Sequence, residues 1–329
     1  MKGGLKEIEI TNFKSIRSLV LSDCRRINVL IGRPNVGKSN ILEALALFDV
    51  PYFAHSSFKS LKSLLRINNT SELFHNGDSS SPIAINTGKD KLRAARTLYD
   101  GLTIDMLYNG RANKFSLPRT LTLPASTKPI IFLPDILVYF FPVHFSPSSS
   151  NHSFLIPPYG SNLMEIVANT PALKEELSEL FHTYGLKLLF DTGSKEIRAM
   201  KEDGFDMFLV PFGSLADSLR RLIFYKCAIE SNRNKVICIE EPEAHTFPPY
   251  ITNIVNDLLE SVTNQFFLTT HSPYVLSALL ESAGDELAVY VVDMKNSATV
   301  ARRLSDKELQ EAYDNGMDMF YNIEAYSAE

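Results

Sequence analysis

The C-terminal part of the chain, from residue 206 onward, alternates between continuous apolar runs and segments with helical spacing of apolar residues. The apolar runs are residues 236–239, 266–269 and 287–292. Such runs are typical of strands buried on both faces. The intervening pattern predicts helices over residues 217–230, 251–259 and 273–280. This alternation predicts a mainly parallel, doubly wound α/β sheet.

The N-terminal part predicts three strands and a helix. Residues 5–10 alternate apolar and polar positions, and residues 16–21 predict a second strand after a turn around Asn12. A continuous apolar run follows at residues 27–31, and residues 40–48 carry apolar side chains at helical spacing. A glycine-rich stretch separates the last two segments.

The middle of the chain, residues 51–205, has the weakest pattern. One amphipathic helix is predicted over residues 173–184. Strand-like segments lie at residues 102–107, 130–145, 185–190 and 196–200. We therefore expect residues 1–50 and 206–329 to form the two halves of one core. Residues 51–205 would be an inserted β-rich lobe with a short helical arm.

The composition is that of a soluble globular protein, with 329 residues of which 45% are hydrophobic and 22% charged. No apolar run has the length of a membrane span, and the N-terminus lacks the apolar core of a signal peptide. We therefore expect a cytoplasmic protein without a membrane anchor. The three cysteines have no C-x-x-C spacing, which predicts buried free thiols.

The net charge of −5 means that any contact with nucleic acid needs a local basic patch. Two groups of basic residues are candidates: Lys89, Lys91, Arg93 and Arg96, and Lys59, Lys62 and Arg66. A solvated helix face is the simpler interpretation of each group. DNA binding therefore stays an alternative that the charge does not favour.

The glycine-rich stretch before residues 40–48 reads GRPNVGKS and has the spacing of a phosphate-binding P-loop. Glycines allow the backbone to wrap a phosphate, so that successive N–H groups point inward. Lys38 would place its charge near the β- and γ-phosphates, and the Ser39 hydroxyl would bind Mg²⁺. The expected nucleotide contacts are Gly32, Asn35, Gly37, Lys38, Ser39 and Asn40.

A second candidate segment begins where the apolar run at residues 236–239 ends in Glu240 and Glu241. Adjacent residues at a strand end point in different directions, so Glu240 can face the metal while Glu241 faces an attacking water. His271 lies just beyond the next apolar run, at the sheet edge where α/β sites gather. These residues complete a candidate site for nucleotide hydrolysis.

The order of these segments resembles that of ABC-type ATPase heads of the RecF/SMC branch. Within that branch the chain is most similar to stand-alone ATPases related to the OLD family (overcoming lysogenization defect). The segments that carry the resemblance are LKEIEITNFKSI, GRPNVGKSNILEALAL, LADSLRRLIF, ICIEEPEAHTFPPY and FFLTTHSPYVLSAL. They imply a P-loop NTPase fold, an ABC-type head with a mixed sheet that uses ATP and Mg²⁺.

The resemblance implies a role for each matching residue. Lys38 and Ser39 are the lysine and the metal-binding hydroxyl of the P-loop. Glu240 is the second metal ligand, in a position where many ABC proteins have Asp. Glu241 is the catalytic base, and His271 is the switch histidine.

Heads of this kind hydrolyse ATP as head-to-head homodimers, in which a signature loop of one subunit caps the γ-phosphate held by the other. The matching tripeptide, residues 216–218, is Ala-Asp-Ser, so Ala replaces the usual Ser and Ser replaces the usual Gly. Ser214 or Ser218 would then supply the hydroxyl. Asn12 and Lys14 lie where such heads contact the base or sugar of the nucleotide.

About sixty residues follow His271, and they contain no acid cluster of the Toprim type, so the resemblance implies an ATPase without its own effector. The leading hypothesis is an ATP-driven dimeric switch that gates a partner protein encoded nearby, with phage defence as one setting. A RecF-like DNA-repair ATPase and an ATP-binding scaffold with little turnover are the alternatives. The absence of an LSGGQ-type signature argues against a transporter motor.

Overall fold

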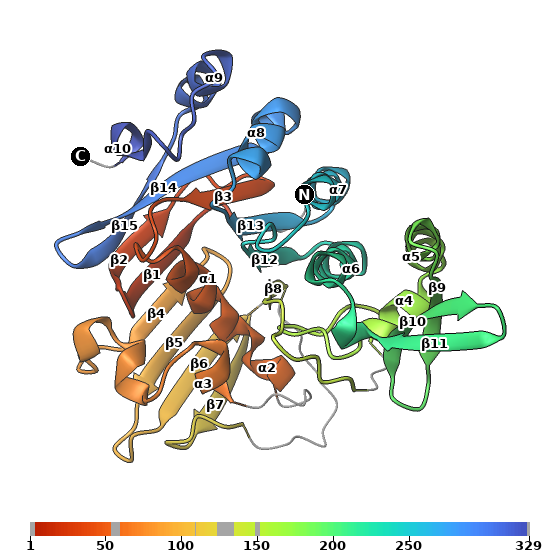
Figure 1. Ribbon diagram of the computed structural model, residues 1–329. Coiled ribbons are helices and arrows are strands. Elements are labelled where there is room, and N and C mark those ends of the chain that lie inside the picture. Colours follow the sequence, from red (N-terminus) through yellow and green to blue (C-terminus); the bar gives the residue numbers. More distant parts are fainter. Residues whose placement is uncertain (1–3, 54–59, 109, 124–134, 149–151, 328–329) are drawn as a thin grey trace. The chain divides into compact units, whose positions relative to one another are not determined.

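The computed structural model describes residues 4–53, 60–108, 110–123, 135–148 and 152–327. The chain forms two compact units (Figure 1). The first contains residues 1–138, 234–241 and 262–329, and the second contains residues 139–233 and 242–261. Each unit has its own strands, helices and buried side chains.

The central sheet of the first unit is mixed. Its strand order is β15 (Ala298–Arg303), β14 (Leu287–Lys295), β3 (Ile27–Ile31), β13 (Gln265–Thr269), β12 (Val236–Glu240) and β8 (Ile136–Tyr139). β14, β3, β13 and β12 are parallel neighbours, and β15 pairs with β14 in the antiparallel direction. β3 and β13 are buried at every position. The predicted mainly parallel α/β sheet is therefore confirmed.

Helices follow the parallel strands of this sheet. α1 (Lys38–Ala46) follows β3, α8 (Pro273–Ser282) follows β13, and α9 (Asp306–Asp314) packs against α8. The Ser272 hydroxyl accepts a hydrogen bond from the Val275 N–H and so caps α8. Shorter helices of this unit are α2 (Val50–Phe53), α3 (Leu61–Leu64) and α10 (Ile323–Tyr326), with 3₁₀ turns at Leu47–Asp49, Thr70–Leu73, His75–Gly77 and Gly284–Glu286.

A second, fully antiparallel sheet belongs to the same unit. Its order is β2 (Ile16–Leu21), β1 (Ile8–Phe13), β4 (Ile83–Asn86), β5 (Lys91–Arg96), β6 (Leu102–Tyr108) and β7 (Arg111–Leu117). The sequence did not predict β4, β5 or β7, since these strands are short or polar on their solvent face. Ile10 pairs with Ile85. The first unit therefore contains β1 and β2 together with β4 to β7. The division of the chain expected at residues 50 and 206 stays a prediction.

The second unit combines a small sheet with four helices. The sheet order is β11 (Asp206–Pro211), β10 (Glu196–Asp203) and β9 (Lys187–Asp191). The helices are α4 (Leu163–Asn169), α5 (Pro171–Thr183), α6 (Asp217–Glu230) and α7 (Pro248–Glu260), and a 3₁₀ turn lies at Phe212–Ser214. α5 corresponds to the arm helix that the sequence predicted.

Among the residues that the structure describes, no helix is long and apolar enough to cross a membrane. Cys24, Cys227 and Cys238 are buried and free, as predicted. Burial raises the pKa of the Cys24 thiol to about 11, so this thiol is unreactive at neutral pH.

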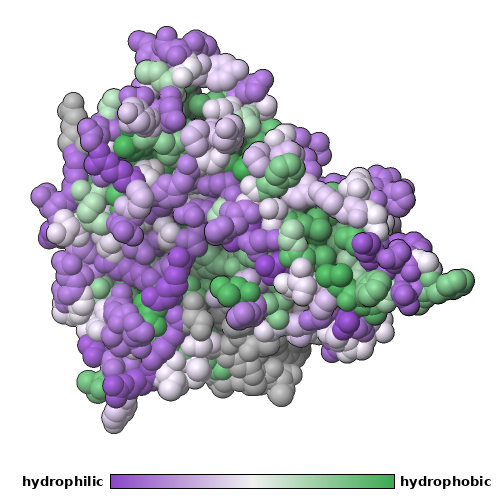
Figure 2. Space-filling view, viewed as in Figure 1, coloured by the Kyte–Doolittle hydropathy of each residue, from purple (hydrophilic) through white to green (hydrophobic). Residues whose placement is uncertain are grey.

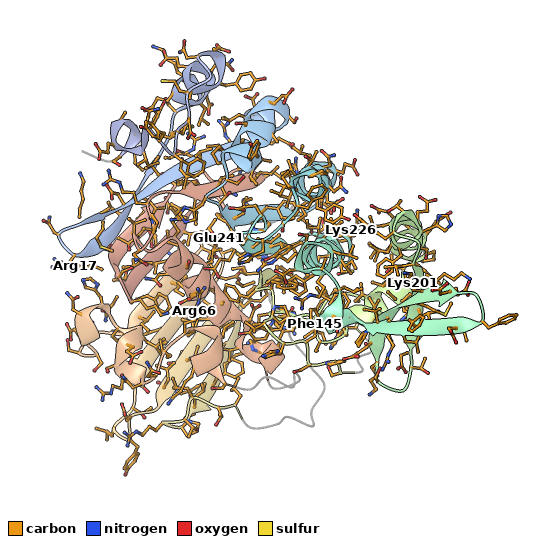
Figure 3. All side chains as sticks on the ribbon, in the orientation of Figure 1. Arg17, Arg66, Phe145, Lys201, Lys226 and Glu241 are labelled. Atoms are coloured by element: carbon orange, nitrogen blue, oxygen red, sulfur yellow. The ribbon has the colours of Figure 1, made fainter. Side chains whose placement is uncertain are left out.

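α6 and α7 are joined by a buried lysine with several acidic partners (Figure 3). The Lys226 side chain is 6% exposed, and its Nζ lies 2.8 Å from Asp257, 2.9 Å from Glu230 and 2.9 Å from Glu176. Asp257 is itself 9% exposed. These contacts tie α5, α6 and α7 together, because a charge at this depth is stable only beside opposite charges.

Lys226→Met is expected to lower the free energy of unfolding by about 3 kcal/mol, because the change leaves Asp257 buried without its counter-charge. Urea denaturation followed by circular dichroism measures this difference. The control is Lys307→Met, which removes an exposed lysine from a pair with Glu311 and should change stability little. Equal effects of the two substitutions would contradict the role given to Lys226.

Candidate nucleotide-binding site

The P-loop connects β3 to α1 and has the backbone that the sequence predicted. Gly32, Asn35 and Gly37 have positive φ angles of 153°, 63° and 98°. These conformations favour glycine and asparagine, and they let consecutive N–H groups face one side of the loop. α1 begins at Lys38, so the positive end of its helix dipole faces the same place.

The back of the loop rests on Ser15 and Thr299, which sequence reasoning missed. The Thr299 hydroxyl donates to the Val36 carbonyl at 2.9 Å and lies 2.6 Å from the Ser15 hydroxyl. The Asn40 amide also donates to the Ser15 hydroxyl, at 2.6 Å. A Cβ atom at Gly37 would lie only 2.1 Å from Thr299 Oγ1. The second glycine is therefore required by close packing as well as by its φ angle.

Lys38 is buried inside the loop. The residue is 5% exposed, and its Nζ donates to the carbonyl oxygens of Gly32 and Arg33 at 2.9 and 2.8 Å. Burial lowers the pKa of Lys38 to about 8, while the Glu241 carboxylate opposes the shift. An anion such as a phosphate would raise the pKa of Lys38 again and stabilise its charged form further, because it would supply the compensating charge.

A chain of alternating charges borders the loop. The buried Glu43 carboxylate on α1 binds Lys14 Nζ, and its other oxygen lies 2.8 Å from Arg66 Nε. Arg66 Nη2 in turn lies 2.5 Å from Glu240 Oε2. Burial raises the pKa of Glu43, whereas Lys14 and Arg66 oppose that rise. The predicted metal ligand Glu240 is thus paired with a guanidinium group.

Arg66 is the main residue of this site that sequence reasoning misplaced. The sequence favoured a solvated face for Lys62 and Arg66, yet Arg66 contacts two carboxylates and borders the phosphate loop (Figure 3). Lys59 lies outside the described residues. No local motif marked Arg66, because its partners Glu43 and Glu240 are distant in sequence.

Glu241 and His271 lie close to each other, just beyond the ends of β12 and β13. Glu241 Oε1 lies 3.6 Å from His271 Nε2. The Glu241 N–H donates to the Thr269 carbonyl at 3.1 Å and fixes the end of β12 against β13. Its φ is +41°, a conformation unusual for a non-glycine residue. Burial and the nearby Lys38 lower the pKa of His271, so the imidazole is neutral at physiological pH.

These elements surround one cavity of about 390 Å³. The predicted site residues that line it are Asn35, Gly37, Lys38, Ser39, Asn40, Lys14, Glu241 and His271, joined by Pro34, Glu43 and Arg66. Gly32 and Glu240 do not line the cavity, but Gly32 binds Lys38 and Glu240 binds Arg66. Lys38, Lys14 and Arg66 supply cations to the cavity, and Glu241 supplies a partly exposed carboxylate. The cations suit a phosphate chain, and the carboxylate suits a water molecule beside it.

Two other predicted residues have structural partners. The Asn12 amide donates to the carbonyls of Asp78 and Ser81 at 3.0 and 2.8 Å, so it holds that loop and does not line the cavity. Ser218 belongs to the second unit, where its hydroxyl donates to the His245 carbonyl at 2.9 Å and accepts from the Phe247 N–H at 3.1 Å. Its role in a signature loop stays a prediction.

Sequence comparison finds a family model and a similar protein. A family model described as "AAA domain, putative AbiEii toxin, Type IV TA system" matches residues 27–277. The uncharacterized protein MJECL10 of Methanocaldococcus jannaschii is 50% identical over 44 residues, which are 13% of this chain. The match spans about a fifth (20%) of that protein.

Two solved structures are similar over nearly the whole chain. One is the Smc head bound to the C-winged helix domain of ScpA, with 16% identity, a TM-score of 0.53, and coverage of 93% of this chain and 99% of that chain. The other is the Smc head with an extended coiled coil, bound to the C-terminal domain of ScpA, derived from Pyrococcus furiosus; it has 14% identity, a TM-score of 0.55, and coverage of 94% and 98%. The fold is therefore that of an SMC-type P-loop ATPase head, which confirms the predicted fold class.

Gly37→Ala is expected to weaken ATP binding at least about tenfold, because the new Cβ both strains a positive φ and displaces Thr299 from the loop. Titration with a fluorescent ATP analogue measures the affinity. Gly110→Ala is the matched control, since Gly110 has a φ of +74° but nothing within 4 Å of the added Cβ. Unchanged affinity in Gly37→Ala would contradict the packing argument.

Proposed function

The chain belongs to this AAA-domain family, and we propose that it binds ATP and hydrolyses it with the help of Mg²⁺. The observation that carries the proposal is the buried Lys38 inside a loop whose cavity also contains Glu241 and His271. A lysine at this depth needs a compensating anion. The cavity also contains a carboxylate in position to act on water near that anion.

ATP binding would replace the present hydrogen-bond partners of Lys38 with phosphate oxygens. Lys38 now donates to two carbonyls of its own loop, and it would donate to the β- and γ-phosphates when ATP is present. The loop N–H groups would hold the same phosphates, because they face the cavity side of a positive-φ turn. Ser39 and Glu240 would hold Mg²⁺, which would neutralise phosphate charge.

Glu241 fits the role of general base. Its side chain is 39% exposed, which gives water access to the carboxylate. The neutral His271 imidazole, 3.6 Å from that carboxylate, can exchange a hydrogen bond with it or with the γ-phosphate. Orientation of the attacking water and electrostatic stabilisation supply most of the acceleration in phosphoryl transfer.

Arg66 and Lys14 are the cations that border the cavity outside the loop. Glu43 holds both of them, so neither is free to leave when the cavity is open to solvent. We propose that Arg66 turns from Glu240 toward the phosphates when ATP binds, which would also release Glu240 for Mg²⁺. One movement would then complete both the anion site and the metal site.

The proposed output is a dimeric switch that gates a protein effector, with phage defence as one setting. The support is the SMC-type head fold, which the solved relatives carry in complexes with ScpA domains. A ligand shifts such an equilibrium only by its different affinity for the open and closed states. An effector would therefore bind the ATP-bound dimer and the free chain with different affinities.

A second candidate function, polyanion binding, is favoured by the exposed face of the antiparallel sheet. A groove of about 670 Å³ there is lined by Lys91, Arg93 and Lys114, with Asp105 paired to Lys114 at 3.2 Å. Salt-sensitive retention of duplex DNA, weakened in Lys91→Ala/Arg93→Ala, would support a RecF-like role. Equal retention of both proteins would exclude this face as the DNA-binding surface.

Glu241→Gln is expected to keep ATP affinity and to slow hydrolysis by at least about 10²-fold, since the amide cannot accept a proton from water. Phosphate release measures the rate, and the fluorescent ATP analogue measures the affinity. Lys38→Ala should lose both activities. Glu175→Gln, at an exposed position on α5 in the second unit, is the control. Hydrolysis at the wild-type rate in Glu241→Gln would refute the assignment of the base.

Arg66→Gln distinguishes two roles for the Arg66–Glu240 pair. If Arg66 turns to the phosphates, Arg66→Gln lowers the rate of hydrolysis about tenfold or more, because the variant lacks a cation that stabilises the negative charge of the transition state. If Arg66 only blocks Glu240, hydrolysis rises. We expect the fall. Arg17→Gln, an exposed change on β2, is the control. A rise measured by phosphate release would contradict the proposed movement.

Gating of an effector has its own test. Glu241→Gln, loaded with ATP and Mg²⁺, is used as bait for the purified product of a neighbouring gene, with a nucleotide-free sample beside it. We expect capture that depends on nucleotide. Capture of equal strength in both samples would contradict gating while leaving the ATPase assignment intact.

A further inference from the structure

The strand β11 exposes an unusual run of large apolar side chains. Its sequence is DMFLVP, and Met207, Phe208 and Leu209 are 69%, 55% and 53% exposed. Phe205, in the turn before the strand, is fully exposed. Figure 2 shows hydrophobic residues gathered over the β10–β11 hairpin and its tip. Apolar surface of this kind on one short element usually marks an interaction site.

β11 carries exposed side chains on both of its faces, and it is the terminal strand of its sheet. Phe208 pairs with Lys201 and Leu209 pairs with Met200, so successive side chains of β11 stand on opposite faces of the sheet. The sheet order β11–β10–β9 places β11 at the edge, with one row of its backbone N–H and C=O groups outside the ladder to β10. Edge strands normally carry charges or prolines that prevent pairing. In β11 these residues, Asp206 and Pro211, stand only at the two ends.

We propose that β11 pairs with β11 of a second copy of this chain, in the antiparallel direction and without nucleotide. The two three-stranded sheets would then form one continuous six-stranded sheet. A two-fold axis perpendicular to the sheet keeps each side chain on its own face, so residues that oppose each other must share a face. The axis therefore passes beside Phe208 or beside Leu209, and that residue lies opposite its own counterpart.

The strand is self-complementary in both of these registers. With Phe208 on the axis, Met207 lies opposite Leu209 of the second copy. With Leu209 on the axis, Phe208 lies opposite Val210 of the second copy. In both cases the central apolar side chains meet other apolar side chains, which is the pairing that stabilises sheets.

The distribution of charge favours antiparallel over parallel pairing of the two β11 strands. The hairpin end of the sheet carries the acids Glu202, Asp203 and Asp206 and the lysines Lys201 and Lys187, of which Lys187 pairs with Glu202 at 2.7 Å, so this end keeps an excess of negative charge. Antiparallel pairing places the two acidic ends at opposite ends of the joined strands, whereas parallel pairing would bring them side by side. Like charges directly opposite each other destabilise a sheet. The same acidic end would suit a basic strand of another protein, which is the competing occupant.

The first test is the mass of the purified full chain in solution, measured without nucleotide by analytical ultracentrifugation. We expect a dimer at micromolar concentration and a monomer for Phe208→Asp/Leu209→Asp. The matched control is Leu98→Asp, a fully exposed leucine in the turn between β5 and β6, which should remain a dimer. Circular dichroism melting confirms that each variant is folded.

The second test is disulfide cross-linking, which the buried positions of the three native cysteines make specific. Phe208→Cys and Leu209→Cys are oxidised separately, and one of them should give a covalent dimer, since its sulfur faces its own counterpart. Leu98→Cys should give none. A monomeric wild-type chain, a dimer that survives Phe208→Asp/Leu209→Asp, or the absence of a cross-link in both cysteine variants would overturn the proposal. A monomeric chain would leave a strand of another protein as the occupant of β11.

Discussion

A lysine ammonium group buried at the edge of a parallel sheet is the constraint on which the rest of this site depends. Lys38 is 5% exposed, and the carbonyl oxygens of its own loop hold it in the absence of an anion. A protein interior stabilises such a charge only through oriented dipoles or opposite charges. The two loop carbonyls and the carboxylate of Glu241 serve that need, whereas the positive end of α1 opposes it and favours an anion instead. A phosphate chain then fits this place, because an anion removes the cost of burying the lysine.

The cations around the cavity are already held by carboxylates of the same unit. Glu43 binds Lys14 and Arg66, and Arg66 also binds Glu240. Nucleotide binding at such a border is an exchange of counter-ions, so its net energy is the difference between two sets of ion pairs. This arrangement keeps the border ordered in the empty state. It also links Glu240 to Lys14, between the N-terminal strands β1 and β2, through three ion pairs.

Sequence patterns predicted the parts of the fold whose signal is local. The strands β3, β12 and β13 were predicted because their runs are apolar on both faces. The P-loop was predicted because its glycines, lysine and serine have a fixed spacing in the sequence. The strands β4, β5 and β7 were missed because each is short or polar on one face. Ser15, Thr299 and Arg66 were missed for a different reason. Their importance comes from contacts with distant residues, which no local pattern records.

The contact between Thr299 and the P-loop has a consequence for the order of synthesis. The Thr299 hydroxyl binds the Val36 carbonyl across 263 residues of chain. A ribosome makes the phosphate loop early and its support late. The nascent N-terminal part therefore has the glycines and the lysine but lacks the wall behind them. The loop therefore gains this support only after the C-terminal hairpin β14–β15 has been made, so its final packing belongs to the last stage of synthesis.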